Sequence, residues 1–312
     1  MLDVFLLAAP LYLLIAGGFL VVRSGYLPPE TLGGVGQFAL KVCLPVLIFA
    51  AVSRPGGLLA LNWSFILGYS GASFAVIATI AAVMRRVFGL PLSRSIVLGL
   101  GAGSSNSAFL GLPVVTIALG EEAAVLFAWI LIAENMVVIP LCVSLAESAE
   151  SRRAGFLAAL RSVLAGMVRS PLMIGLVAGL AVSLTGVEAP APVARTMAMI
   201  VSAAPVLSLM LVGGFIAHEN LRAAGLPALI VTLAKLGLHP LAVYLTLGAL
   251  PGVAPGDVVG GMLFAAVPMF TIFTLFAGRH GGEGVASAAL VLTTASSVIT
   301  VNLALFVAFS LL

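Results

Sequence analysis

The sequence is poor in charge. Only 8% of its 312 residues are Asp, Glu, Lys or Arg, whereas 62% are hydrophobic. This composition excludes a soluble domain of this size and indicates an all-α membrane protein that crosses the bilayer many times. The net charge of +3 is spread along the chain, and the lack of a basic tract excludes a nucleic-acid-binding protein.

Cysteines and catalytic motifs are also scarce. Cys43 and Cys142 are the only cysteines, and both lie in apolar runs, so the sequence contains neither a disulfide framework nor a metal site. It has no His-Glu-x-x-His motif, no Walker loop and no paired carboxylates inside an apolar segment. Ser104 or Ser105 with His239 imitates a serine-protease dyad, but no Gly-x-Ser-x-Gly turn surrounds either serine. We therefore expect no enzymatic activity and no cofactor.

Ten apolar segments are candidates for membrane helices, which need about 20 residues each. They are Val4–Val22, Leu32–Val52, Trp63–Met84, Ser93–Leu119, Ala123–Ala146, Pro171–Leu184, Val193–Ala217, Leu226–Leu250, Asp257–Ala277 and Val285–Leu312. The first follows Met1 without a basic region or a small-residue cleavage site, which predicts a retained helix and not a cleaved signal. Between the fifth and sixth, Arg153–Val168 has helical periodicity and is predicted to lie on the membrane surface.

The positions of the basic residues predict the orientation in the membrane. Of the 14 basic residues, ten lie in or beside the odd-numbered loops. Only Arg54 and Arg195 lie in or beside even-numbered loops, and Lys41 and Lys235 lie within segments. Loops rich in Lys and Arg stay in the cytoplasm, so the odd-numbered loops are cytoplasmic and both termini face outward. The sequence thus predicts a multi-pass membrane protein.

The two halves of the chain share a pattern of prolines and glycines. Gly18 follows Pro10 by 8 residues, and Gly179 follows Pro171 by 8 residues. Further pairs in the same order are Pro28 with Pro190, Pro45 with Pro205, and Pro113 with Pro268. Five segments per half is an odd number, so the second copy must be inverted in the membrane, as in many secondary transporters. The predicted parts are a first repeat (1–146), a cytoplasmic linker (147–170) and a second, inverted repeat (171–312).

The fourth segment is predicted to be broken. Between Gly99 and Pro113 it carries four glycines, three serines, one asparagine and one proline. In a helix interior, Gly is about 1 kcal/mol and Pro about 3 kcal/mol less favourable than Ala. The composition favours two half-helices with an unwound link around Ser105–Pro113, where polar groups gather near the midplane. A kinked, glycine-rich packing helix is the alternative.

The most specific motif is Ser105–Pro113, with the sequence Ser-Asn-Ser-Ala-Phe-Leu-Gly-Leu-Pro. It resembles Ser-Asn-Thr-Gly-Phe-Leu-Gly-Leu-Pro of the auxin efflux carrier family, which includes plant PIN-FORMED carriers and bacterial malonate-type permeases. Leu44–Phe49 and Lys235–Pro240 match the Leu-Pro-x-Leu-x-Phe and Lys-x-x-x-His-Pro patterns of its second and eighth segments. Pro268 and Thr293–Ser297 resemble its ninth and tenth segments. The resemblance covers the whole chain.

This resemblance implies ten transmembrane helices in two inverted five-helix repeats. The broken fourth and ninth helices would cross in mid-membrane. The first, second, sixth and seventh segments would form a scaffold, and the others a moving transport unit. The short linker is of the bacterial kind, so the resemblance implies a protein of the bacterial inner membrane. The resemblance also allows a homodimer.

The predicted substrate-binding residues surround the two breaks and the second segment. Asn106 and the neighbouring serines either donate hydrogen bonds to a carboxylate or satisfy the unwound backbone. Lys41 either neutralises a substrate carboxylate, forms a structural ion pair, for example with Glu134, or snorkels toward the membrane surface. The complete set is Ser104, Ser105, Asn106, Ser107, Pro113, Lys41, Pro45, Pro268, Met269, Phe270 and Thr271.

A second set is predicted to form a coupling or support site, because ionisable groups inside a membrane are functional by default. It consists of Glu134, Asn135, Lys235 and His239. Glu134 either relays a proton or pairs with a lysine. Lys235 and His239 share a helix face, where they either gate the core or brace it. Sodium coupling is not expected, since no acidic residue lies beside either break.

The predicted substrate is an anion. Half-helices beginning near Val114 and Met269 would direct positive dipole ends toward the crossing. The sequence therefore predicts secondary transport of a small organic anion, an auxin-like or malonate-like carboxylate, by alternating access. A passive anion channel and a non-transporting receptor on the same fold are the alternatives. A carrier saturates and shows counterflow, whereas a channel shows neither.

Overall fold

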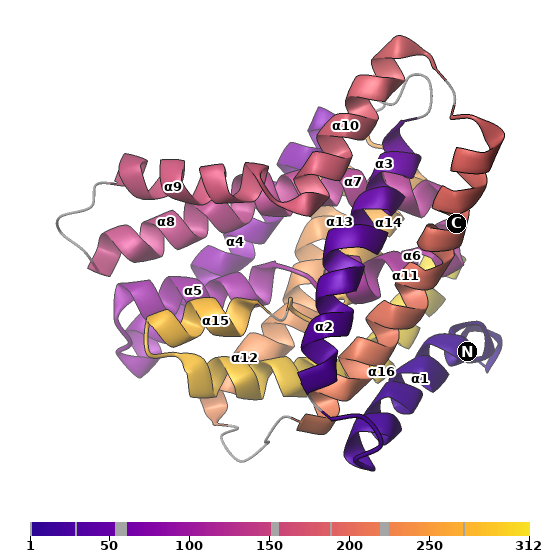
Figure 1. The fold of residues 1–312 in the computed structure, drawn as a ribbon. Coiled ribbons are helices and arrows are strands. Elements are labelled where there is room, and N and C mark those ends of the chain that lie inside the picture. Colours follow the sequence, from indigo (N-terminus) through magenta and orange to yellow (C-terminus); the bar gives the residue numbers. More distant parts are fainter. Residues whose placement is uncertain are drawn as a thin grey trace.

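The computed structural model describes residues 2–28, 30–53, 61–150, 156–187, 189–218, 225–270 and 272–312. All regular structure in these ranges is helical (Figure 1). The helices are α1 (Leu2–Arg23), α2 (Glu30–Phe38), α3 (Leu44–Val52), α4 (Trp63–Phe88), α5 (Leu92–Gly103), α6 (Leu112–Leu119), α7 (Glu122–Ile132), α8 (Ile139–Glu150), α9 (Phe156–Val168), α10 (Pro171–Thr185), α11 (Ala191–His218), α12 (Leu226–Leu233), α13 (His239–Ala249), α14 (Pro255–Ala266), α15 (Phe273–Arg279) and α16 (Glu283–Leu311).

Eight helical stretches in the described part of the chain are long and apolar enough to cross a membrane. The number rises to nine if Phe156–Gly166 and Pro171–Thr185, which are bent against each other, count as one span. The sequence predicts ten. The sixth predicted span is present as α10, with only 15 residues, and the ninth is divided into α14 and α15.

In the part of the chain that the structure describes, four spans contain a π-helical turn shortly before a proline. The turns η1 (Ala39–Cys43), η2 (Ser107–Gly111), η3 (Ala133–Val138) and η5 (Ala234–Leu238) precede Pro45, Pro113, Pro140 and Pro240. A proline lacks an N–H group, and its ring clashes with the carbonyl one turn earlier, so a widened turn accommodates it. Lys41, Ser107, Glu134 and Lys235 all lie in these turns. The widened turns therefore coincide with polar positions of the predicted sites.

Glycines allow two pairs of helices from opposite halves of the chain to pack backbone to backbone. Gly18 of α1 faces the backbone of Met210 in α11, and Gly179 of α10 faces the backbone of Phe49 in α3. A Cβ atom at either glycine would overlap its neighbour. Small residues of this kind let membrane helices approach closely. Each helix of the predicted scaffold thus holds a helix from the other half.

Buried side chains form one large cluster at one end of the bundle, which we call the packed end. It joins α3, α6, α7 and α14 through residues such as Leu47, Val115, Leu126 and Leu263. The other halves of these four spans, α2, α5, α8 and α15, lie at the opposite end, which we call the cavity end. There the buried side chains belong to separate clusters, one of which joins α5 to α15 and another α2 to α11. In Figure 1, α5, α8, α9 and α15 lie on one side of the α2–α3 span and α1 and α11 on the other.

Candidate functional site

The break in the fourth span is shorter than the sequence predicts. α5 ends at Gly103, and only Ser104–Asn106 lack helical structure before η2 begins. The predicted link extended to Pro113, but this proline lies in the first turn of α6. A proline is tolerated there because the amide it lacks has no partner within the first turn.

The two breaks meet at one backbone hydrogen bond. The amide of Asn106 donates to the carbonyl of Pro268 at 2.8 Å. Pro268 lies in the non-helical stretch between α14 and α15. Thr271 of the same stretch lies outside the described residues. The fourth and ninth spans are therefore joined at the point where both are unwound.

Asn106 also starts the helix that follows it. Its Oδ1 accepts from the amide of Phe109 at 3.3 Å, and its carbonyl accepts from the amides of Leu110 and Gly111. Because Oδ1 is the acceptor, Nδ2 is the free end of the side chain, with two donors. The structure gives Nδ2 no hydrogen-bond partner among the described residues. One end of the Asn106 side chain therefore satisfies the unwound backbone, and the other end carries two free donors.

Glu134 holds the unwound link in place. This residue of η3 is buried, and its Oε1 accepts from the amide of Ser105 at 2.9 Å and from the hydroxyl of Tyr69 at 3.3 Å. Its Oε2 accepts from Ser107 Oγ at 2.9 Å. Hydrogen bonds that a carboxylate accepts are charge-assisted and strong. Among the described residues Glu134 makes no direct ion pair with Lys235, because Ser105 lies between them.

Lys235 is fully buried behind Ser105. Its Nζ has three acceptors: Ser105 Oγ at 2.8 Å, the carbonyl of Ala265 at 2.7 Å and His239 Nδ1 at 2.9 Å. A lysine ammonium has three donors, so the group is fully satisfied. The other ring nitrogen of His239 lies 3.0 Å from Ser73 Oγ. The network ties the eighth span to the third, fourth and ninth spans.

Two predicted residues of the second span lie away from this network. Lys41 is exposed, and its Nζ donates to Gln37 Oε1, one turn earlier in the same span, at 3.0 Å. The structure thus places the Lys41 ammonium group in a local contact within its own span and outside the network around Glu134. Pro45 packs against Gly175 of α10 and belongs to the contact between those two helices.

Other predicted residues fulfil packing or local roles. Met269 is buried against the cluster that contains Phe273. Ser104 is buried, and its Oγ has no hydrogen-bond partner within the described ranges. Asn135 Nδ2 donates to the carbonyl of Leu131 in its own span at 3.2 Å.

The sequence reasoning missed Tyr69 and Ser73, both on α4. They lie four residues apart and therefore on one helix face. That pairing of polar groups is the signal that would have found them.

A cavity of about 480 Å³ lies beside the crossing, at the cavity end. Its polar lining residues are Gln37, Ser105, Asn106, Ser107, Glu134 and Asn135. Its apolar lining includes Phe109, Phe127, Phe215 and Phe270. Among the described residues, no Lys, Arg or His lines it. A second space of about 20 Å³ adjoins Asn106 and Phe215, which line both.

Comparisons with known proteins identify the family of the chain. A family model described as "Membrane transport protein" matches residues 3–305. A protein of Rhizobium meliloti (strain 1021), named "Putative malonate transporter", is 28% identical over 304 residues, which cover 95% of this chain and 93% of that protein. The family that the sequence motifs predicted is thereby confirmed.

Proposed function

Because the chain belongs to the membrane transport protein family, we propose that it is a secondary transporter that carries a small organic anion by alternating access. The observation that carries this proposal is the cavity beside the crossing of the two breaks. It lies between α2, α10 and α11 on one side and the Ser104–Asn106 link on the other. Unwound backbone at membrane depth is tolerated where it lines such a space.

The donors around the cavity support an anionic ligand. Asn106 Nδ2 is available, and Ser107 and Ala108, whose amides precede the first intrahelical bond, both line the cavity. Positive dipole ends and free amides of this kind stabilise anions. The carboxylate of Glu134 does not repel the ligand strongly, because three donors already occupy its oxygens and Lys235 lies behind Ser105.

The lining also supports a particular class of anion. Four phenylalanines line the cavity, and no basic residue among the described ones does. One carboxylate finds donors at Asn106 Nδ2 and at the backbone amide of Ser107. A second carboxylate would be desolvated without a cationic partner, which is unfavourable by several kcal/mol. We therefore favour a monocarboxylate with an apolar body over a dicarboxylate such as malonate, the compound in the relative's name.

Alternating access needs two bodies that separate at one end while they stay packed at the other. The scaffold is α1–α3 with α10 and α11, and the transport unit is α4–α8 with α12–α16. Within the transport unit, Arg94 Nε donates to the carbonyl of His280 at 3.0 Å, and the His280 ring contacts the carboxylate of Glu150. These contacts tie the fourth, fifth and ninth spans together at the cavity end.

The distribution of charge supports an inward-open state. The scaffold part of the cavity lining comes from the start of α2, the start of α10 and the last turns of α11. Arginines in the adjoining loops favour the cytoplasm for all three of these helix ends. An impermeant thiol reagent applied to whole cells should therefore label Ser310→Cys but not Ser162→Cys. If the reagent labelled Ser162→Cys and not Ser310→Cys, the protein would have the opposite orientation in the membrane.

Uptake into proteoliposomes tests the function. Labelled phenylacetate, a monocarboxylate with an apolar ring, should enter with saturation and counterflow. Malonate should compete at least about tenfold more weakly, since its second carboxylate has no partner. A flux that stays linear and shows no counterflow would indicate a channel. Saturable transport that prefers malonate would contradict the choice of a monocarboxylate but would leave the proposed transport of an organic anion in place.

A further inference from the structure

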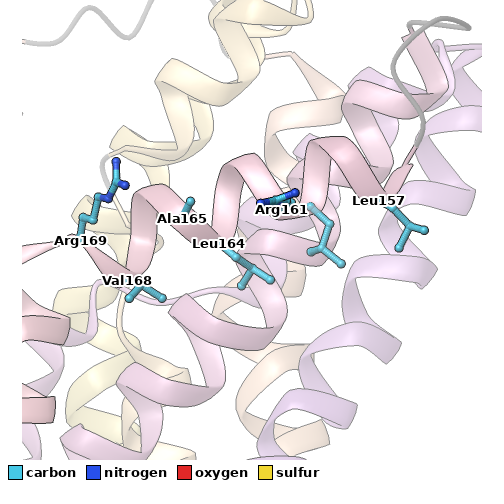
Figure 2. Close-up of a pocket in the computed structure, with 7 residues that line it drawn as sticks. Leu157, Arg161, Leu164, Ala165, Val168 and Arg169 are labelled. Carbon is cyan, nitrogen blue, oxygen red and sulfur yellow. The ribbon is translucent and has the colours of Figure 1, made fainter.

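The outer face of α9 carries an open groove that the transport mechanism does not use. The groove has a volume of about 530 Å³, and its lining consists of α9 side chains and Arg169. Leu157 and Val168 in it are 77% and 55% exposed. Figure 2 shows Leu157, Leu164 and Val168 leaving the helix on one side and Ala165 and Arg169 on the other. Apolar side chains with this exposure are more stable when a bound molecule shields them from water.

The helical periodicity explains how α9 divides its faces. At about 100° per residue, Leu157, Leu164 and Val168 fall within a stripe of roughly 40°. Val163 lies on another face, where it packs against the buried cluster of α4, α5 and α8. On the side away from that packing, Arg161 borders the stripe and Arg169 lies farther round the helix. The exposed surface of α9 is therefore an apolar stripe with two guanidinium groups beyond one of its edges.

We propose that the α9 groove binds an anionic phospholipid of the cytoplasmic leaflet. An acyl chain would cover Leu157, Leu164 and Val168, and the phosphate would contact Arg161 and Arg169. The charge complementarity carries this choice, because guanidinium groups bind phosphate with paired hydrogen bonds. The linker that contains α9 is cytoplasmic by its arginine content, and the cytoplasmic leaflet holds anionic lipids.

The position of the groove gives the lipid a mechanical role. α9 packs along α8 of the transport unit, and Arg169 is followed within two residues by α10 of the scaffold. A lipid held by α9 therefore acts at the joint between the two bodies. This role rests on the proposed transport function, whereas lipid binding itself does not.

Thermal denaturation of the full-length purified protein in detergent tests the site. Phosphatidylglycerol and phosphatidylcholine with the same acyl chains are titrated separately. Phosphatidylglycerol should raise the melting temperature at a concentration at least about tenfold lower, since each basic residue strengthens binding to anionic lipid several-fold. The Arg161→Gln/Arg169→Gln variant should lose this preference and keep its response to phosphatidylcholine.

Matched variants separate this site from general charge effects. Arg85→Gln/Arg86→Gln removes two exposed arginines from the last turn of α4 and should keep the preference. Arg161→Lys/Arg169→Lys keeps the charge and should retain most of the preference for phosphatidylglycerol. This variant keeps the test decisive if the glutamine variant does not fold. An equal response to both lipids, an equal loss in the α4 variant, or stabilisation by inorganic phosphate alone would each overturn the proposal.

Discussion

The packed end and the cavity end of the bundle are made by the same spans but differ in how the two bodies meet. At the packed end, α3 of the scaffold and α6, α7 and α14 of the transport unit share one buried cluster. At the cavity end, α2 with α11 and α5 with α15 form clusters of their own. One half of a span can thus pack tightly against the other body while its second half packs only within its own body.

The difference follows from what lies at the middle of each span. The breaks at Ser104–Asn106 and around Pro268, with the π-helical turns of the second, fifth and eighth spans, divide these helices into halves. Because the backbone hydrogen bonds are interrupted between the two halves, each half-helix can take its own direction and pack against different neighbours. The polar network of Glu134, Ser105 and Lys235 lies at this division.

The largest predicted effect is on that network. Lys235→Met should lower the free energy of unfolding by about 3–5 kcal/mol, because it leaves Glu134 as a buried carboxylate without its cation. The measurement is denaturant unfolding in detergent. Adding Glu134→Gln should restore a large part of the loss. If the double variant is no more stable than Lys235→Met, the two charges are not coupled through Ser105.

The next effect compares the two ends with one residue type in one span. Leu263 of α14 is 0% exposed at the packed end, whereas Leu275 of α15 is 67% exposed beside the cavity. Leu263→Ala should lower the free energy of unfolding by about 2–5 kcal/mol and Leu275→Ala by less than about 1 kcal/mol. Equal losses would mean that both ends are packed alike.

A smaller effect is expected on ligand affinity. Asn106→Ala removes the donor that faces the cavity and should weaken carboxylate binding by about 1–3 kcal/mol. It also removes a helix cap, worth about 0.5–2 kcal/mol of stability, so melting temperature is measured beside affinity. Asn135→Ala is the matched control, because its amide bonds to Leu131 in its own span. Equal losses of affinity in the two variants would assign Asn106 to packing.

The smallest effect concerns Lys41. Lys41→Met should change carboxylate affinity by less than about threefold, because the ammonium group is exposed and bonded to Gln37, and exposed polar pairs contribute little. Isothermal titration of a monocarboxylate measures it. A tenfold loss would return Lys41 to the ligand site and indicate another conformation in which it reaches the crossing.

Particular residues show where sequence reasoning succeeded and where it failed. Gly99–Pro113 predicted a break, and the break is present because glycine and polar side chains weaken the helix there. Its length was overestimated, since Ser107–Gly111 forms a π-helical turn. Lys235 and His239 were paired correctly from their spacing. Their partners Ser105, Ala265 and Ser73 come from other spans, so no local pattern could reveal them.

The sequence by itself determined that the chain is a helical membrane protein, that its fourth and ninth spans are broken and that Glu134 and Lys235 lie inside spans. These properties depend on composition and local propensity, which act within one span. Only the tertiary structure decided that Glu134 holds the link, that Lys41 lies outside the network and that a cavity lies beside the crossing. Those outcomes depend on which faces of separate helices meet, and that choice is made by packing among all of them at once.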